Sequence, residues 1–158
     1  MRHRFEFGVV LLAVSILGLV LAERLQYVEE RNEQIQVRLA VRLLDAAVRI
    51  RMAELLIAND AQTIERLRQE NPFDWLSPQL QNYAGARTAQ QLQGREDVAQ
   101  GRWYFDTTRH EAVYTVLNGS HFSSRSGSRL IRYRVQVIAS GRRLEGARIE
   151  VVEQYNWF

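Results

Sequence analysis

A run of sixteen uncharged residues, from Phe7 to Ala22, constrains this chain more than any other feature. The run is mostly Val, Leu and Ile, and a helix of that length spans roughly 24 Å at 1.5 Å per residue. The hydrocarbon core of a bilayer is about 30 Å thick. Phe5 before the run, and Leu25 and Val28 after it, can extend the apolar length to that thickness. We therefore expect a helix that crosses a membrane once.

The charges that flank this run predict its orientation. Arg2 and Arg4 precede it, whereas Glu23, Glu29 and Glu30 follow it. Positively charged flanks stay on the cytoplasmic side of a membrane. We expect a cytoplasmic N-terminus, with everything after Glu23 exported.

A cleaved signal peptide is the alternative, because the run is also near the length of a signal-peptide core. Val20, Leu21 and Ala22 are small enough to allow cleavage after Ala22. A long helical pattern begins directly after the run, however, without a helix breaker between them. This continuity favours a retained membrane anchor, and both interpretations export the rest of the chain.

Glu6 is an unusual residue for the edge of an apolar helix. A carboxylate costs about 2–3 kcal/mol if it enters the centre of the bilayer. At the cytoplasmic headgroups, beside Arg2 and Arg4, it would cost almost nothing. The functional alternative is that Glu6 pairs with the N-terminal amine of a neighbouring subunit or with an assembly platform protein, which makes it the candidate assembly residue.

Residues 23–57 contain no glycine or proline and favour a continuous helix. Residues 23–34 form a polar neck with almost nothing to bury. Beyond the neck, apolar residues recur every three or four positions, as one face of a helix does. This apolar stripe consists of Ile35, Leu39, Leu43, Ala46, Ile50, Ala53 and Ile57. We expect the stripe to pack on the folded domain; a coiled-coil stalk of about three heptads, which would need a partner helix, is the alternative.

A short, mixed segment follows the long helix. Asn59 and Asp60 end that helix and are expected to cap a second one, which stops at Asn71-Pro72 because a residue before proline avoids helical geometry. Residues 82–101, with three glycines and many Ala and Gln residues, are expected to form an irregular connection.

The C-terminal third changes to the period of two that is typical of strands. Four strands are predicted, at 103–106, 112–117, 130–139 and 147–157. The alternation predicts an antiparallel sheet with one buried face. The fold class is α+β: a long N-terminal helix, first transmembrane and then amphipathic, packed on a small antiparallel meander. The expected parts are 1–28 (tip and membrane helix), 29–58 (neck and amphipathic half), 59–101 (connection) and 102–158 (sheet).

Composition excludes several chemistries. The chain has no cysteine, which removes disulfides, thiol catalysis and cysteine-based metal sites. Its three histidines, His3, His110 and His121, are too far apart for a ligand motif, so we expect no metal site. His121 has serines nearby, but we expect it to lie in a solvated loop. There is no nucleotide-binding glycine motif, so we expect no cofactor and no enzymatic activity.

Two surface features have competing interpretations. Arg125, Arg129, Arg132 and Arg134 form a basic stretch. We expect them to be solvated or paired across strands with Glu150 and Glu153. Capture of DNA or another polyanion is the alternative, although a net charge of +3 gives it little support. Trp157-Phe158 is expected to be buried at the sheet edge, with an exposed interaction patch as the alternative.

Several motifs resemble those of type IV pilin-like proteins, a family that includes pilus subunits and the pseudopilins of type II secretion. The resemblance is carried by the order of the parts and by four motifs, which are Phe5-Glu6-Phe7-Gly8, Asn71-Pro72-Phe73-Asp74-Trp75-Leu76, Asn82-Tyr83-Ala84-Gly85, and Trp103-Tyr104-Phe105-Asp106 ahead of Val113-Tyr114. Within the family, the chain is most similar to accessory components of pilus biogenesis of the mannose-sensitive haemagglutinin (MSHA) type.

The chain also departs from the family pattern. The family's processing site has a glycine, then Phe, then Glu at the fifth mature position, whereas here no glycine precedes Phe5 and Glu6 follows it directly. The family's helix-breaking proline and C-terminal cysteine pair are also missing. The resemblance therefore implies an uncleaved anchor with an initiating, tip or assembly role, and carries Glu6 over as the assembly residue.

Two functional hypotheses follow. The first is a non-enzymatic pilin-like component of the bacterial inner membrane, with a periplasmic domain and with other pilin-like or pilus-assembly proteins as partners. The second is a membrane-tethered periplasmic sensor or regulatory binding module. Neither hypothesis includes nucleic acid, and the first includes no small-molecule substrate.

Overall fold

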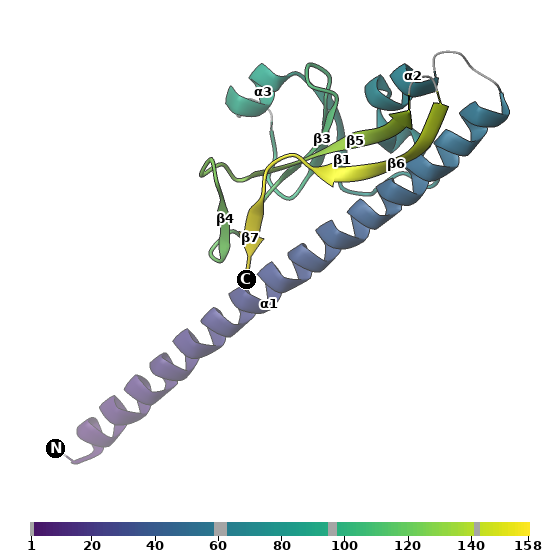
Figure 1. The fold of residues 1–158 in the computed structure, drawn as a ribbon. Helices are drawn as coiled ribbons and strands as arrows, with labels where there is room; N and C mark the ends of the chain where they lie inside the picture. Colours follow the sequence, from purple (N-terminus) through teal and green to yellow (C-terminus); the bar gives the residue numbers. More distant parts are fainter. Residues whose placement is uncertain (1, 59–62, 95–97, 141–142) are drawn as a thin grey trace.

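The fold is a single long helix with a small mixed domain packed against its distal half (Figure 1). The structure is a computed structural model that describes residues 2–58, 63–94, 98–140 and 143–158. Helix α1 (Arg2–Ile57) has 56 residues, which corresponds to a rod of about 84 Å. Its N-terminal half projects away from the domain, and the C-terminus of the chain lies beside α1 near the point where α1 leaves the domain (Figure 1). This is the expected α+β arrangement.

A five-stranded sheet of order β1-β2-β3-β5-β6 forms the centre of the domain. All neighbouring strands are antiparallel except β1 and β2, which are parallel. A separate two-stranded antiparallel sheet joins β4 and β7. The strands are β1 (Tyr83–Arg87), β2 (Trp103–Asp106), β3 (Glu111–Thr115), β4 (Phe122–Ser124), β5 (Leu130–Ser140), β6 (Arg143–Val151) and β7 (Tyr155–Trp157).

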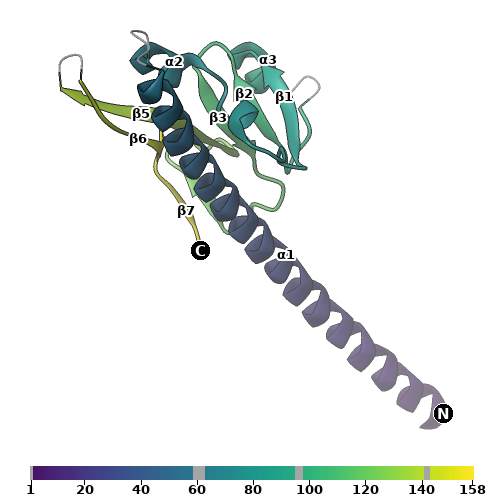
Figure 2. The ribbon, with the colours of Figure 1, turned by 90° about the vertical axis from the view of Figure 1, so that its right-hand side faces the viewer.

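Helices cover both faces of the five-stranded sheet (Figure 2). α1 and the short α2 (Thr63–Gln69) pack on the face that carries Ile131, Tyr133 and Val135. Successive residues of a strand point to opposite faces. The short α3 (Ala89–Gly94) therefore covers the other face, where Leu92 packs with Tyr104 and Val113.

The irregular connection expected over 82–101 is wrong, because this segment contains β1 and α3. Strand β1 shows no alternation of buried and exposed residues, and α3 has six residues, fewer than two turns. Neither element therefore leaves a periodic signal. The strand expected over 147–157 is also wrong, because it is divided between β6 and β7, which belong to different sheets.

The other expected elements agree more closely. Strand β5 matches its predicted range to one residue, and the 3₁₀ helix η1 (Pro72–Trp75) follows α2 where Asn71-Pro72 was expected to stop it. Helix α1 ends at Ile57. The expected capping by Asn59 and Asp60 lies outside the described residues, as do residues 141–142 of the last turn.

Three of the four motifs that carry the family resemblance, all except the one at residues 5–8, meet in one place beneath α1. Phe73 stacks on Tyr83 with ring centroids 4.3 Å apart, and contacts Trp103 at 5.8 Å. Asn71 caps η1 by accepting a hydrogen bond from the Phe73 N–H at 3.2 Å, and its Nδ2 donates to the Tyr83 hydroxyl at 3.0 Å. These motif residues therefore form core packing and a helix cap.

Candidate functional site: the neck and outer face of the long helix

Glu30 anchors the domain to the neck of α1. Its side chain is 2% exposed. Oε1 accepts hydrogen bonds from the His121 backbone N–H at 2.8 Å and from Trp157 Nε1 at 3.0 Å, and Oε2 lies 2.9 Å from His121 Nδ1. Burial raises the pKa of Glu30, but the hydrogen bonds from His121 and Trp157 outweigh burial and hold its pKa below the ordinary value.

Glu33, one turn further along α1, makes a second attachment. Its Oε1 accepts from the Tyr114 hydroxyl at 3.0 Å and the Leu117 N–H at 2.8 Å, and its Oε2 accepts from the Asn118 N–H at 2.8 Å. Burial raises the pKa of Tyr114, and the nearby Glu33 charge raises it further, so this phenol stays protonated as a donor. Hydrogen bonds to a charged acceptor are about twice as strong as neutral ones.

The expected polar neck with nothing to bury is therefore wrong. Glu30, Glu33 and Gln34 are all buried, because the loop after β3 turns its N–H groups toward α1 and needs acceptors there. His121 does lie in a loop before β4 with its side chain 49% exposed, as expected, but it also bonds to Glu30 through both its backbone and its ring, which was not expected. The local sequence gives no signal for these long-range partners.

Aromatic rings close the base of the domain around the neck. His121 stacks on Phe158 with centroids 4.8 Å apart, and Tyr27 meets the Phe158 ring edge-on at 5.1 Å. The Arg31 guanidinium lies 4.7 Å from the centroid of the Phe158 ring. Trp157 is buried, which confirms its expected burial, and its carbonyl accepts a hydrogen bond from Gln34. Together with the two carboxylates, these contacts fix the direction in which α1 leaves the domain.

The apolar stripe of α1 does not face the sheet, so the packing expected for it is wrong. All seven of its residues are exposed, and its Leu and Ile side chains range from 43% exposed at Leu43 to 86% at Ile57. A different set packs on the sheet and α2, which we call the inner face: Val37, Ala40, Val41, Leu44, Ala47, Val48 and Leu55.

The two apolar faces lie on opposite sides of α1. At about 100° per residue, the mean direction of the stripe is roughly half a turn from that of the inner face. Small and β-branched side chains dominate the inner face, where the sheet comes close to the helix. The stripe has the larger side chains. Helical periodicity is present in both faces. The stripe was expected to pack on the sheet because its side chains are larger, and this choice was wrong.

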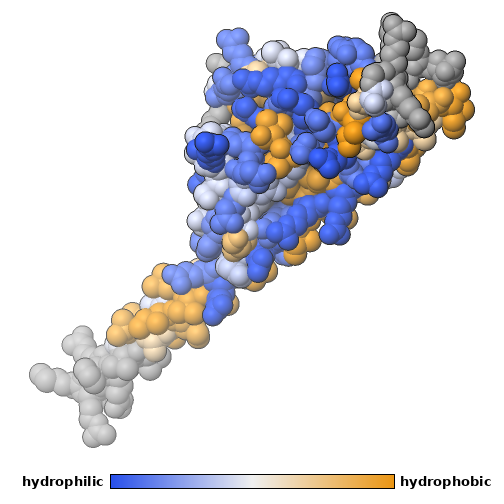
Figure 3. Space-filling view, in the orientation of Figure 1, coloured by the Kyte–Doolittle hydropathy of each residue, from blue (hydrophilic) through white to orange (hydrophobic). Residues whose placement is uncertain are grey.

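The exposed surface of the N-terminal half of α1 is also apolar (Figure 3), and residues in line with the stripe connect the two. Leu21, Leu25 and Val28 lie on the same side of the helix and are exposed, and only the polar Asn32 interrupts the line to Ile35. The described part of α1 from Leu11 is long and apolar enough near the N-terminus to span a membrane. Both a membrane anchor and a signal sequence have these properties. Glu6 lies within α1, and its side chain is outside the described part of the structure.

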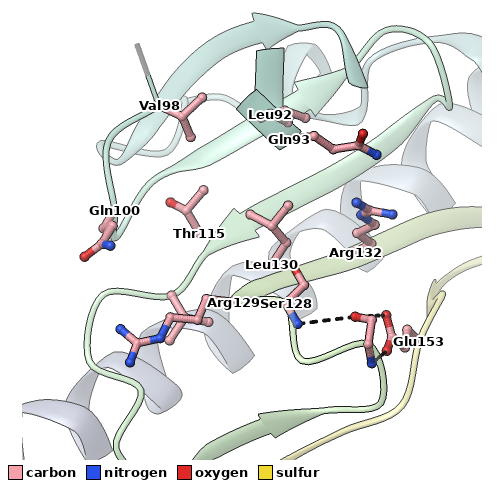
Figure 4. A pocket seen from close by; sticks show the side chains of 12 residues that line it. Leu92, Gln93, Val98, Gln100, Thr115, Ser128, Arg129, Leu130, Arg132 and Glu153 are labelled. Carbon is pink, nitrogen blue, oxygen red and sulfur yellow. Dashed lines mark hydrogen bonds between the residues drawn. The ribbon is translucent and has the colours of Figure 1, made fainter. Parts of the chain in front are cut away.

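A cavity of about 340 Å³ opens on the opposite face of the sheet (Figure 4). Leu92 of α3, Val98 and Leu130 of β5 give it apolar walls. Arg129 and Arg132 bring positive charge, and Glu153, which accepts a hydrogen bond from Ser126, brings one negative charge. Within the described residues, no ion pair is found for either arginine. The cavity falls in the size range of small-molecule sites and could accept an apolar group that carries an anion.

Arg125, Arg129 and Arg134 of the basic stretch are exposed, as the solvated half of the expectation had it. The other half, pairing with Glu150 and Glu153, is wrong for the described residues. Arg134 bonds to Glu111, its neighbour on β3, although it is also in register with Glu150 on β6. Glu111 is 1% exposed, so it gains more from a charged partner than an exposed carboxylate does. Glu150 instead lies 3.4 Å from Arg148, and Glu153 accepts hydrogen bonds from Ser126.

No group of three or more His, Cys, Asp or Glu side chains that could hold a metal ion occurs among the described residues. Comparison of the chain with family models, with curated proteins and with solved structures gives no match. The geometry of α1 is therefore the main evidence for function.

Proposed function

We propose that this protein is a non-enzymatic, membrane-anchored, pilin-like component for assembly of a type IV pilus of the MSHA type or a related secretion filament. The observation that carries the proposal is the exposed apolar side of α1, which runs from the candidate membrane span to Ile57 and is not covered by the domain. Contiguous apolar surface of this kind marks a site of interaction with protein or membrane.

The membrane limits what can cover this surface. A stripe along a helix that rises directly out of a bilayer is best covered by another helix that rises beside it. The resemblance to pilin-like proteins implies an assembly of this kind, in which helices that share a membrane pack side by side. The neck supports the same function, because Glu30 and Glu33 hold the domain on one side of α1 and leave the other side open.

The proposed orientation places the N-terminus in the cytoplasm of the bacterial inner membrane and the domain in the periplasm. The basic residues before the span and the acidic residues after it support this orientation. In this arrangement Glu6 lies at the cytoplasmic end of the span. There its carboxylate would pair with the N-terminal amine of a neighbouring subunit or with a platform protein.

Deletion of the gene followed by complementation tests the proposal. We expect the deletion strain to lose surface pili, counted by electron microscopy, and the wild-type gene to restore them. A variant with Leu39→Ser and Ile50→Ser on the stripe should reach the membrane but fail to restore pili. Arg38→Ser, at an exposed position about a quarter of a turn away from the stripe, should complement fully. Unchanged pilus number and secretion in the deletion strain would refute an assembly role.

The cavity supports a second candidate, a membrane-tethered periplasmic sensor or regulatory binding module. Its apolar walls and the two arginines without an ion pair among the described residues are the observations that favour this alternative. Purification of the intact protein from membranes separates the two candidates. Pilus-assembly proteins in the eluate favour the first, and a kinase or a channel favours the second.

A further inference from the structure

The apolar stripe has the spacing of a coiled-coil seam. From Leu39 onward its residues are separated by four, three, four, three and four positions, which is the alternation of positions a and d in a heptad. Leu43, Ile50 and Ile57 occupy a positions, and Leu39, Ala46 and Ala53 occupy d positions. A stripe that packed on a sheet would not need this strict repeat, and in this structure no described residue covers it.

A second helix has access to this seam. The sheet, α2 and α3 all lie on one side of α1 (Figures 1 and 2). The seam faces away from them, because its residues are exposed and lie opposite the inner face. Two copies could therefore meet along residues 39–57 with both domains pointing outward. A helix anchored in the same membrane starts from the same level and runs in the same direction, so the pairing would be parallel and in register.

The charges beside the seam fit a copy of the same helix. In a parallel pair, position g of one chain meets position e of the partner five residues later. Arg49 occupies g and Glu54 occupies e, so each would meet its opposite charge across the seam. Both side chains are accessible, with Arg49 67% and Glu54 59% exposed. Among the described residues each has one local partner, Asp45 for Arg49 at 2.7 Å and Arg51 for Glu54 at 3.3 Å.

We propose that α1 forms a parallel two-stranded coiled coil with α1 of a second copy, through the a and d residues between Leu39 and Ile57. Ile at a positions favours two strands, and Ala at d positions brings the two backbones close. The seam is only about three heptads long, and confinement of both helices to one membrane would supply the effective concentration that a short coiled coil needs. This inference rests on the proposed function in two respects, because it uses the same exposed face and the same membrane anchor.

Disulfide trapping in membranes tests the pairing, because the chain has no cysteine of its own. In a parallel pair each a residue faces its own counterpart, within reach of a disulfide, whose Cα atoms are usually about 5.5–6 Å apart. We expect the full-length variant Ile50→Cys to form a disulfide-linked dimer as its major species under mild oxidation. Arg38→Cys, an exposed residue at a c position of the same helix, is the matched control and should remain monomeric.

Two further measurements test register and charge. When Leu43→Cys and Ile50→Cys chains of different mass are co-expressed, each should link to its own kind and not to the other. In the Ile50→Cys chain, adding Arg49→Glu should slow linking several-fold, and adding Glu54→Arg as well should restore it.

Equal linking of Ile50→Cys and Arg38→Cys would overturn the coiled coil, as would linking of Ile50→Cys to a protein of different mass in place of itself. Either result would leave the proposed assembly role intact if the deletion strain still loses its pili. If instead the deletion strain keeps its pili and Ile50→Cys still links efficiently to itself, the assembly role fails and the coiled coil stands.

Discussion

At the scale of single residues, the buried carboxylate of Glu30 allows the most direct test. It is 2% exposed and accepts from His121 and Trp157, so its replacement leaves buried donors without a charged acceptor. We expect Glu30→Gln to lower the free energy of unfolding of the domain by about 2 kcal/mol. The three tryptophans of the full-length protein in detergent provide the fluorescence signal for a denaturant titration.

Glu29→Gln is the matched control for this change, because Glu29 is the preceding residue and is exposed. Its effect should stay within about 0.5 kcal/mol, as is usual for surface substitutions. Equal effects of the two substitutions would contradict the role of Glu30 as an attachment point.

The same carboxylate predicts a dependence of stability on pH. The pKa of Glu30 is lower in the folded protein than its ordinary value, so the folded state binds this proton less readily than the unfolded chain. The stabilisation from Glu30 is therefore complete above about pH 4.3, the usual glutamate pKa, and is lost as the pH falls through the lower folded-state pKa. Unfolding titrations at a series of acidic pH values should show a steeper loss for the wild type than for Glu30→Gln. Parallel curves would contradict this prediction.

At the scale of elements, α1 contains a pair of adjacent leucines on opposite sides. Leu44 is fully buried against the sheet and Leu43 is 43% exposed on the stripe. We expect Leu44→Ala to destabilise the domain by about 3 kcal/mol, the usual cost of a cavity in a core. Leu43→Ala should change the stability of the domain by less than about 1 kcal/mol and should reduce disulfide trapping at Ile50→Cys. If Leu43→Ala destabilised the domain more than Leu44→Ala, the stripe and not the inner face would be the side of α1 that packs on the sheet.

The same pair shows how far the sequence could predict this fold. Helical periodicity predicted a long amphipathic helix, and the alternation of Ile131, Tyr133, Val135 and Val137 predicted β5 and its buried face, because both are local patterns. The choice between two apolar faces is not local, since it depends on which face fits the sheet closely. Strand β1 was missed for a similar reason: it is held by parallel pairing to β2 and not by a pattern of its own.

The candidate site was predictable only in part. The seam residues were identified from the sequence, but as core, and their exposure is the reason we propose the coiled-coil alternative in its place. Glu30 and Glu33 were not identified, because their partners lie more than eighty residues away along the chain. A possible signal was their placement with Gln34 on one side of the helix, continuous with the apolar inner face that begins at Val37.

At the scale of the whole molecule, α1 connects the candidate membrane span to the domain without a break. The described helix is continuous from Arg2 to Ile57, and no break occurs at the end of the apolar run. A rigid rod would transmit the position of the span directly to the domain. The neck contacts at Glu30, Glu33 and Phe158 lie just beyond the expected membrane surface, so the domain would be held close to the bilayer in a fixed orientation.

This continuity predicts that the apolar segment is retained. Signal peptidase needs an accessible, non-helical segment at its cleavage site. The residues around Ala22 instead lie in the middle of a helix. Only eight residues later, at Glu30, this helix is bonded to the folded domain. We expect the intact mass of the protein from washed membranes of its host to correspond to the full chain or to loss of the initiator Met alone. As a control, a variant with Leu17→Pro would interrupt the helix just over one turn before the Ala22–Glu23 bond, without placing proline at that bond, and should increase cleavage there. A wild-type mass that corresponds to a chain beginning at Glu23 would mean that the anchor has been cleaved off. The membrane could then no longer enforce a parallel pairing. This result would favour a soluble periplasmic binding module built around the cavity.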